Sequence, residues 1–232
     1  MITLEICAQS IQAAIHAYEG GADRVELCID LPAGGLTPSP KLIKQVCHEI
    51  DIPVYVLVRS RAGNFMYSKV EIDIMQDQIK SSVQAGASGI VAGALNDKYF
   101  IDTQALEIFI KAADGLPFTF HRAIESVKNI HLSLDLLMEY NVNRILTGGA
   151  GGNAYTCRTE LSEINKYLNG QMILLAGSGI TSENVEQLIV ETNIKEVHTS
   201  AKLGNAANRQ QNPFDTNTDE VKRIKSIIMQ MN

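Results

Sequence analysis

The stretch LEICAQSIQAAIHAYEGGADRVELC, residues 4–28, holds two short apolar segments, LEIC and VELC, on either side of an amphipathic one. Apolar residues of the middle segment recur at intervals of three and four, which is typical of a helix. Gly21 follows that segment, and glycine tolerates the left-handed conformation in which helices often end. The stretch therefore predicts a strand, a helix and a second strand.

The same alternation continues along the chain. Segments rich in β-branched and aliphatic residues predict eight strands, at 3–7, 24–28, 54–58, 89–92, 118–120, 144–147, 172–176 and 196–199. Amphipathic segments such as PKLIKQVCHEI and NVEQLIVETN separate them, and Gly86, Asn141 and Asn193 stand at further helix-to-strand joints. No glycine-rich dinucleotide loop follows the first strand, so we expect an α/β protein with a (β/α)8 TIM barrel rather than a doubly wound sheet.

The chain has 232 residues, close to the size at which a single domain stops growing. We expect one TIM-barrel domain over 1–232, with the barrel core at 1–201, a polar loop at 202–218 and a C-terminal helix at 219–231. No apolar run approaches the roughly 20 residues of a membrane span, and the amino terminus does not resemble a secretory signal. These features favour a cytoplasmic protein without a membrane partner.

Charge and cysteine usage exclude further classes of function. The net charge is −6, and the basic residues form no stripe, which argues against a nucleic-acid partner. The four cysteines show no CxxC spacing, and in a reducing compartment they are free thiols or metal ligands. A zinc-dependent DNA-repair barrel of the endonuclease IV kind is disfavoured, because only His121 and His198 of the five histidines stand at strand ends.

Alternation along the first two strands places Glu5, Cys7, Glu26 and Cys28 on the inner face of the barrel. Because adjacent strands lie about 4.8 Å apart, the two thiols can meet. Packing as small hydrophobic groups would equally explain the cysteines. A buried carboxylate needs a partner, so an ion pair is the structural alternative to a functional role for the two glutamates.

Basic residues follow two other strands. Arg59 and Arg61 come after the third strand, and His121 and Arg122 after the fifth. Guanidinium groups are planar and always charged, which suits the recognition of carboxylates and phosphates. With the glutamates, these residues predict a polar cup at one end of the barrel.

The seventh and eighth strands end in AGSGIT and HTSAK. Loops at these positions form the usual phosphate site of TIM barrels, where backbone N–H groups meet the anion. We therefore expect an anion-binding role for a second set of residues, Gly177, Ser178, Gly179, His198 and Ser200. Glycines after strands are also common simply because tight turns need them.

Taken together, the segments resemble the CutC family, whose members are associated with copper homeostasis. The matching segments are LEICAQS, GGADRVELC, GGLTPS, the pattern R-x-R-x-G-x-F-x-Y-S at 59–68, FTFHRA, RILT, and E-V-H-x-S-A at 196–201. They occur in order from residue 4 to residue 201.

The resemblance implies a cytoplasmic (β/α)8 barrel that assembles as a homo-oligomer, a dimer or tetramer, and handles monovalent copper. Its copper ligands would be Cys7 and Cys28, while Cys47 and Cys157 match no family ligand. The assignment agrees with the preference of the soft ion Cu(I) for thiolates.

The sequence departs from the family pattern at several positions. RSRAGNF stands where the family has RPRGGDF, so Ser60, Ala62 and Asn64 replace proline, glycine and aspartate. Ala33 replaces a glutamate before GGLTPS, and Glu125 in HRAIE replaces an aspartate. Without the carboxylate at 64, a role of this loop as acid, base or hard-metal ligand is less well supported.

Two hypotheses follow. The first is a protein that binds or carries Cu(I) through Cys7 and Cys28. The second is an enzyme that acts on a small anionic molecule, phosphorylated or sugar-like, with Glu5, Glu26 and His121 as catalytic residues and the arginines as clamps. In the enzyme, Glu26 would be the acid or base and His121 a proton carrier near neutral pH.

Overall fold

The computed structural model describes residues 1–150, 152–202 and 215–231. Its strands are β1 Thr3–Ala8, β2 Arg24–Leu27, β3 Val54–Leu57, β4 Gly89–Ala92, β5 Phe118–Phe120, β6 Arg144–Thr147, β7 Ile173–Gly177 and β8 Glu196–Thr199. Its helices are α1 Ile11–Glu19, α2 Pro40–Glu49, α3 Lys69–Gln84, α4 Thr103–Ala112, α5 Ile130–Glu139, α6 Arg158–Leu168, α7 Val185–Thr192 and α8 Thr218–Gln230, with short 3-10 turns η1 Leu31–Ala33 and η2 Arg122–Ser126.

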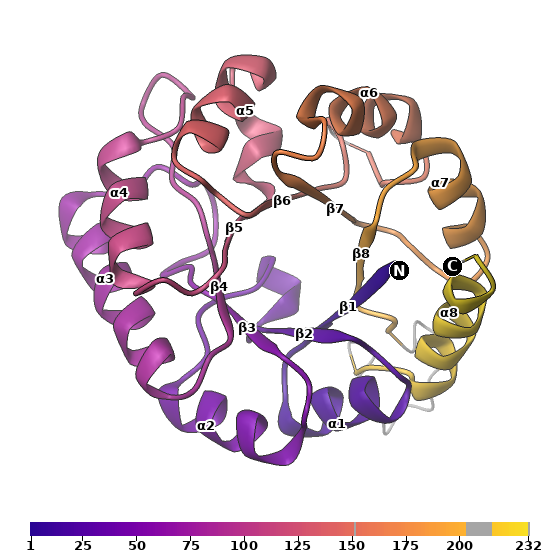
Figure 1. The fold of residues 1–232 in the computed structure, drawn as a ribbon. Coiled ribbons are helices and arrows are strands. Elements are labelled where there is room, and N and C mark those ends of the chain that lie inside the picture. The colour runs from indigo at the N-terminus through magenta and orange to yellow at the C-terminus, as the bar shows by residue number, and fades with distance from the viewer. Residues whose placement is uncertain (151, 203–214, 232) are drawn as a thin grey trace.

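Each strand pairs in parallel with the next, and β8 pairs with β1, so the sheet closes into a barrel. Figure 1 shows the ring of strands with the helices outside it. The predicted α/β class and (β/α)8 barrel are confirmed.

Local sequence signals explain where the helices begin and end. Ser10 and Ser68 accept hydrogen bonds from the first turns of α1 and α3, as helix-capping serines do. The predicted left-handed joints are also present, with φ of 90° at Gly21, 54° at Asn141 and 54° at Asn193. The βα units that end at these residues therefore carry their own stop signal.

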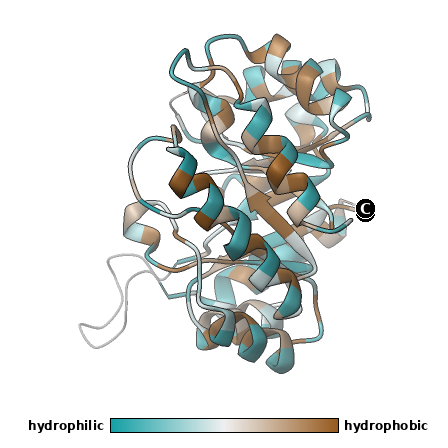
Figure 2. Ribbon diagram, turned by 90° about the vertical axis from the view of Figure 1, so that its left-hand side faces the viewer, coloured by the Kyte–Doolittle hydropathy of each residue, from teal (hydrophilic) through white to brown (hydrophobic). Residues whose placement is uncertain are grey.

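The two faces of the strands have different surroundings. Leu4, Ile6, Val25 and Leu27 belong to the main apolar core, which lies between the barrel and its helices. The outer helices carry hydrophilic and hydrophobic residues in turn, as amphipathic helices do (Figure 2). Cys7 and Cys28 belong instead to a small separate cluster with Tyr55, Leu57 and Val91. This division confirms the predicted inward direction of both cysteines.

The register of β1 against β2 is offset by two residues relative to the sequence repeat. Glu5 pairs with Arg24, and Cys7 pairs with Glu26. A closed barrel needs tilted, staggered strands, and the stagger slides equivalent positions past one another. Residues that match in the repeat are therefore diagonal neighbours rather than direct partners.

A network of charged side chains fills the barrel interior below the cysteines. Arg24 forms ion pairs with Glu5 and Glu196, and Arg144 donates to both carboxylate oxygens of Glu196 at 3.1 and 3.2 Å. Tyr55 accepts a hydrogen bond from Arg144 at 3.2 Å and lies under both guanidinium groups. Because every charge here has an opposite partner, the network is a closed floor rather than a binding surface.

The polar loop predicted at 202–218 falls largely outside the described residues, which omit 203–214. The final helix occupies Thr218–Gln230, close to the predicted 219–231. Within the described residues, no helix has the length and apolar character needed to cross a membrane.

Candidate functional site

Two thiols meet at the end of the barrel where the strands finish. Cys7 lies near the end of β1, and Cys28 directly follows β2. Their sulfur atoms are 3.5 Å apart, and both residues are buried. The Cys7 sulfur also lies 3.6 Å from Oε1 of Glu26. The structure thus brings together both predicted copper ligands and one predicted catalytic carboxylate.

His198 on β8 completes this group. Ligand atoms of Cys7, Glu26 and His198 all lie within 4.8 Å of one another, as a metal site requires. His198 Nδ1 lies 2.7 Å from Oε1 of Glu5, and the His198 ring also interacts with the side chain of Cys7. The sequence placed His198 among the anion-binding residues, whereas the structure places it beside a thiol.

Electrostatics set the protonation of the group. Burial raises the pKa of Glu26 to about 6, although the charge of His198 opposes the shift. Burial disfavours the His198 cation, yet the carboxylates of Glu26 and Glu5 raise the pKa of His198 well above its ordinary value. The hydrogen bond that the Cys7 thiol donates to Cys28, followed by burial, raises the pKa of Cys7 well above its ordinary value. At neutral pH the group therefore holds an imidazolium between carboxylates, with a protonated Cys7.

Glu5 lies deeper than the sequence suggested. Burial alone would raise its pKa, but Arg24 and His198 lower the pKa of Glu5 to about 2. Both of its oxygens have partners, so Glu5 positions His198 and joins the charged floor. Sequence reasoning missed Arg24, although alternation from Glu26 places Arg24 on the same inner face.

A cavity of about 590 Å³ opens above the thiols. Cys7, Cys28, Glu26 and His198 line its inner end. Its walls also include six residues that the sequence assigned to catalysis or anion binding, namely Arg59, His121, Arg122, Ser178, Gly179 and Ser200. Among the described residues, Glu5, Arg61 and Gly177 do not line it.

His121 is held in a defined state on the cavity wall. Its Nδ1 accepts a hydrogen bond from the backbone N–H of Ala123 at 3.2 Å, and its ring packs 4.8 Å from that of Phe65. Burial and the nearby charge of Arg59 lower the pKa of His121 to about 3. The imidazole is therefore neutral at pH 7. His121 was predicted to carry protons near neutral pH, whereas the structure makes it a neutral group in a defined orientation.

The three arginines differ in what they contact. Arg59 is buried and donates to the carbonyl oxygens of Ala33, Gly35 and Gly63 at 2.7 to 3.3 Å, so it ties two loops together at the cavity edge. Arg61 turns away from the cavity, because Glu71 and the 64–66 turn occupy its guanidinium. The predicted clamp at Arg61 is thus wrong in its placement.

Arg122 lines the cavity rim but already has a partner. It donates to both carboxylate oxygens of Glu125 at 2.9 and 2.8 Å. Glu125 also accepts from the backbone N–H of Gly148 at 2.7 Å. The glutamate that departs from the family pattern therefore joins the loops after β5 and β6.

The loop after β7 has an unusual backbone. Ser178 has φ of 84° and Gly179 has φ of 71°, so the chain turns sharply at the cavity edge. A side chain on Gly177 would meet Leu146 at 2.7 Å, which explains the glycine by close packing rather than by a ligand. Gly177 thus serves the fold, while Ser178, Gly179 and Ser200 face the cavity.

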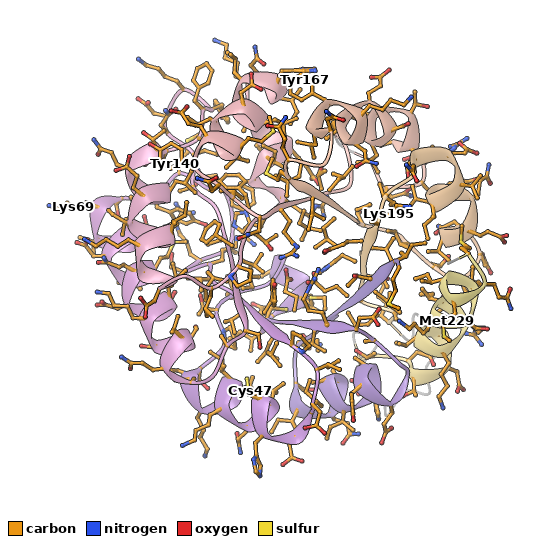
Figure 3. The ribbon with its side chains drawn as sticks, in the orientation of Figure 1. Cys47, Lys69, Tyr140, Tyr167, Lys195 and Met229 are labelled. Atoms are coloured by element: carbon orange, nitrogen blue, oxygen red, sulfur yellow. The ribbon has the colours of Figure 1, made fainter. Side chains whose placement is uncertain are left out.

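The other two cysteines are remote from this site. Cys47 belongs to α2, and Figure 3 labels it in the outer ring of helices. Cys157 directly precedes α6, and its side chain makes no capping hydrogen bond to that helix. Neither lines the cavity within the described residues, so the thiol pair at the strand ends is Cys7 and Cys28.

Comparison with known proteins agrees with this architecture. The sequence model of the CutC family matches residues 2–203. The chain belongs to the CutC family. A CutC family protein from Photobacterium profundum is 37% identical over 201 residues, which cover 87% of this chain and 82% of that relative. The human copper homeostasis protein cutC homolog is 34% identical over 199 residues, covering 86% of this chain and 73% of the human protein.

Solved structures give the same result. The crystal structure of CutC from Streptococcus agalactiae superimposes with a TM-score of 0.81 at 33% identity, covering 86% of this chain and 99% of that one. Phosphoribosyl anthranilate isomerase from Thermotoga maritima has a TM-score of 0.64 at 16% identity, covering 99% and 100% of the two chains. The second likeness shows that the two proteins share the barrel fold.

Proposed function

We propose that this CutC family chain binds Cu(I) as its cargo through the thiolates of Cys7 and Cys28. The observation that carries the proposal is the 3.5 Å separation of the two buried sulfur atoms. Cu(I) is a soft ion that thiolates and imidazole suit, and His198, after releasing one proton, would offer an imidazole nitrogen beside Cys7. The donor set therefore fits monovalent copper better than a hard cation such as Mg²⁺.

Residues around the thiols support this role. The Glu5 carboxylate holds Nδ1 of His198, as outer-shell carboxylates commonly do for metal-binding histidines. Copper binding also requires the thiols to lose their protons. Oε1 of Glu26, at 3.6 Å from the Cys7 sulfur, is the nearby acceptor for the first of them.

The proposal includes a cytoplasmic location and a homo-oligomeric state, dimer or tetramer. A reducing compartment keeps the thiols free, and the relatives named for copper homeostasis support copper as the partner. The acidic net charge of −6 favours neither nucleic acid nor an anionic membrane surface as a partner. Native mass spectrometry of the purified chain reports subunit number and bound metal together.

The test is anaerobic Cu(I) titration of the reduced protein. A Cys7→Ser, Cys28→Ser double variant should lose the tightly bound copper while its circular dichroism stays unchanged. The matched control is Cys47→Ser, Cys157→Ser, which removes the same number of thiols outside the site and should keep wild-type stoichiometry. If the Cys7, Cys28 variant still takes up copper and the Cys47, Cys157 variant does not, the assignment of the ligands is wrong.

A second candidate function is an enzyme that acts on a small anionic molecule, and the cavity favours it. A volume of about 590 Å³ lies within the roughly 300–1,000 Å³ of small-molecule sites and far exceeds the space of one ion. Glu26, with a pKa of about 6, would serve as acid or base, and Arg59 lines the cavity where it can meet negative charge. Glu5 would position His198 rather than touch substrate.

Activity can be sought without knowing the substrate. Metal-free protein is incubated with a small-molecule cell extract, and mass spectrometry identifies compounds that are consumed. Wild-type protein should deplete a compound that Glu26→Gln leaves intact, whereas Glu71→Gln, outside the cavity, should behave as wild type. An extract that wild-type protein leaves unchanged would count against turnover.

A further inference from the structure

Three buried polar atoms on the cavity-lining residues have no hydrogen-bond partner within the described part of the chain. They are Nε of Arg59, Nε2 of His121 and Oε2 of Glu26. The last two belong to residues that are only 4% exposed. Leaving a buried polar group without a partner is unfavourable, so such groups in a cavity indicate that a ligand supplies the missing hydrogen bonds.

The hydrogen-bond network shows which of the atoms of His121 and Glu26 donates. Nδ1 of His121 accepts from the backbone N–H of Ala123, so it carries a lone pair. In a neutral imidazole the hydrogen then lies on the other nitrogen. His121 Nε2 is therefore an N–H donor that needs an oxygen acceptor from a ligand.

Glu26 has the opposite requirement. Its Oε1 faces the thiol of Cys7, whereas Oε2 is unpaired. A carboxylate oxygen accepts hydrogen bonds, so Oε2 needs a hydroxyl or amine donor. One ligand would satisfy both residues if it presented an acceptor oxygen and a hydroxyl group.

Charge distinguishes a hydroxyl-bearing anion from a cationic ligand. The lining carries Arg59, Arg122 and Arg223. Arg122 and Arg223 pair with Glu125 and Glu220, whereas the buried guanidinium of Arg59 donates to carbonyl oxygens, which do not neutralise its charge. This positive charge on the cavity wall favours a ligand with a negative group, and it disfavours an amine.

We propose that the cavity binds a small hydroxylated organic anion, of the size and chemistry of a sugar phosphate or sugar acid. A ligand oxygen accepts from His121 Nε2, a ligand hydroxyl donates to Glu26 Oε2, and the phosphate or carboxylate lies toward the basic lining. This inference rests on the second candidate function, because it names the class of molecule that the enzyme would act on. It is independent of copper binding by the thiols.

The test uses four probes on reduced, metal-free protein. Ribose 5-phosphate and gluconate carry hydroxyl groups together with a phosphate or a carboxylate. Ribose lacks the anion, and inorganic phosphate lacks the carbon-bound hydroxyls. Calorimetry should give each hydroxylated anion a dissociation constant at least tenfold lower than that of ribose or of phosphate.

A second measurement reports on the residue itself. In protein labelled with ¹⁵N-histidine, the Nε2 signal of His121 should shift saturably with the same dissociation constant. His121→Phe removes the donor and should weaken binding at least tenfold. His131→Phe makes the same change on the exposed face of α5 and should bind as wild type does.

The outcomes separate the two ideas. Binding of inorganic phosphate as tight as that of ribose 5-phosphate would overturn the inference, because the hydroxyl groups would then contribute nothing. An unmoved His121 signal at saturating probe would overturn it too, even if His121→Phe failed to fold. Binding with the expected shift but without any chemical change of the probe would uphold the ligand class and count against the enzyme.

Discussion

Nδ1 of His198 lies 2.7 Å from Oε1 of Glu5, and this contact joins the charged floor of the barrel to the thiol site above it. The other oxygen of Glu5 accepts from Arg24, which also pairs with Glu196. The orientation of the His198 ring therefore depends on a network of side chains from β1, β2 and β8. A substitution in the charged network should therefore alter the position of His198 beside the thiols.

Removing the charge of Glu5 should destabilise the fold. In Glu5→Gln, Arg24 and His198 lose a buried counter-charge, and breaking a buried pair typically costs about 3–5 kcal/mol. Urea denaturation measures the loss. The control is Glu191→Gln, which breaks the solvent-exposed pair with Arg158 and should cost less than about 1 kcal/mol. Equal losses would contradict the importance of the buried network.

Acid should remove the contribution of Glu5 progressively. Its pKa is about 2 in the folded chain against an ordinary 4.5, so the folded state favours the ionised form. The stabilisation is full above the ordinary value and is lost as pH falls toward 2. The difference in urea midpoint between wild-type protein and Glu5→Gln should therefore narrow steadily between pH 5 and pH 3. A gap that stays constant over this range would show that the carboxylate charge is not the cause.

Copper affinity should rise with pH. The pKa of Cys7 is raised well above its ordinary value, so this thiol is protonated at neutral pH and must release its proton to bind the ion. For each proton that is released on binding, the apparent association constant for Cu(I) rises about tenfold per unit increase in pH. Competition with a Cu(I) chelator between pH 6 and pH 8, corrected for titration of the chelator, measures the slope. An affinity that does not change with pH would argue against thiolate ligands.

A side chain at Gly35 should disturb the site from behind. Its φ is 85°, and an added Cβ would lie 2.6 Å from Leu57 and 3.7 Å from the Cys28 sulfur. Gly115 has a similar φ of 81° with nothing within 4 Å, so Gly115→Ala isolates the backbone strain of about 1–2 kcal/mol. Gly35→Ala should lose about 1–3 kcal/mol more, from overpacking, and should also weaken copper binding. Chemical denaturation of both variants gives the difference, and equal losses would rule out the contact.

Much of the fold and part of the site follow from local patterns. Alternation along residues 4–7 and 25–28 correctly predicts that Cys7 and Cys28 face inward, because the side-chain period of a strand is two. Gly21 and Asn193 end their helices in the left-handed conformation, which is a local property of the chain. These signals need only a few consecutive residues, so the eight βα units and the inward direction of the cysteines can be predicted from local sequence alone.

The remaining features of the site depend on how the strands and loops assemble. The two-residue offset that puts Arg24 beside Glu5 comes from the stagger that closes the ring, a property of all the strands together. Arg59 and Arg61 both follow β3, yet one lines the cavity and the other turns away, because their partners are loop atoms that pair only after folding. The neutral state of His121 likewise depends on burial and on Arg59. Contacts between residues far apart in the chain determine these features, and they cannot be predicted from the alternation of residues within one strand.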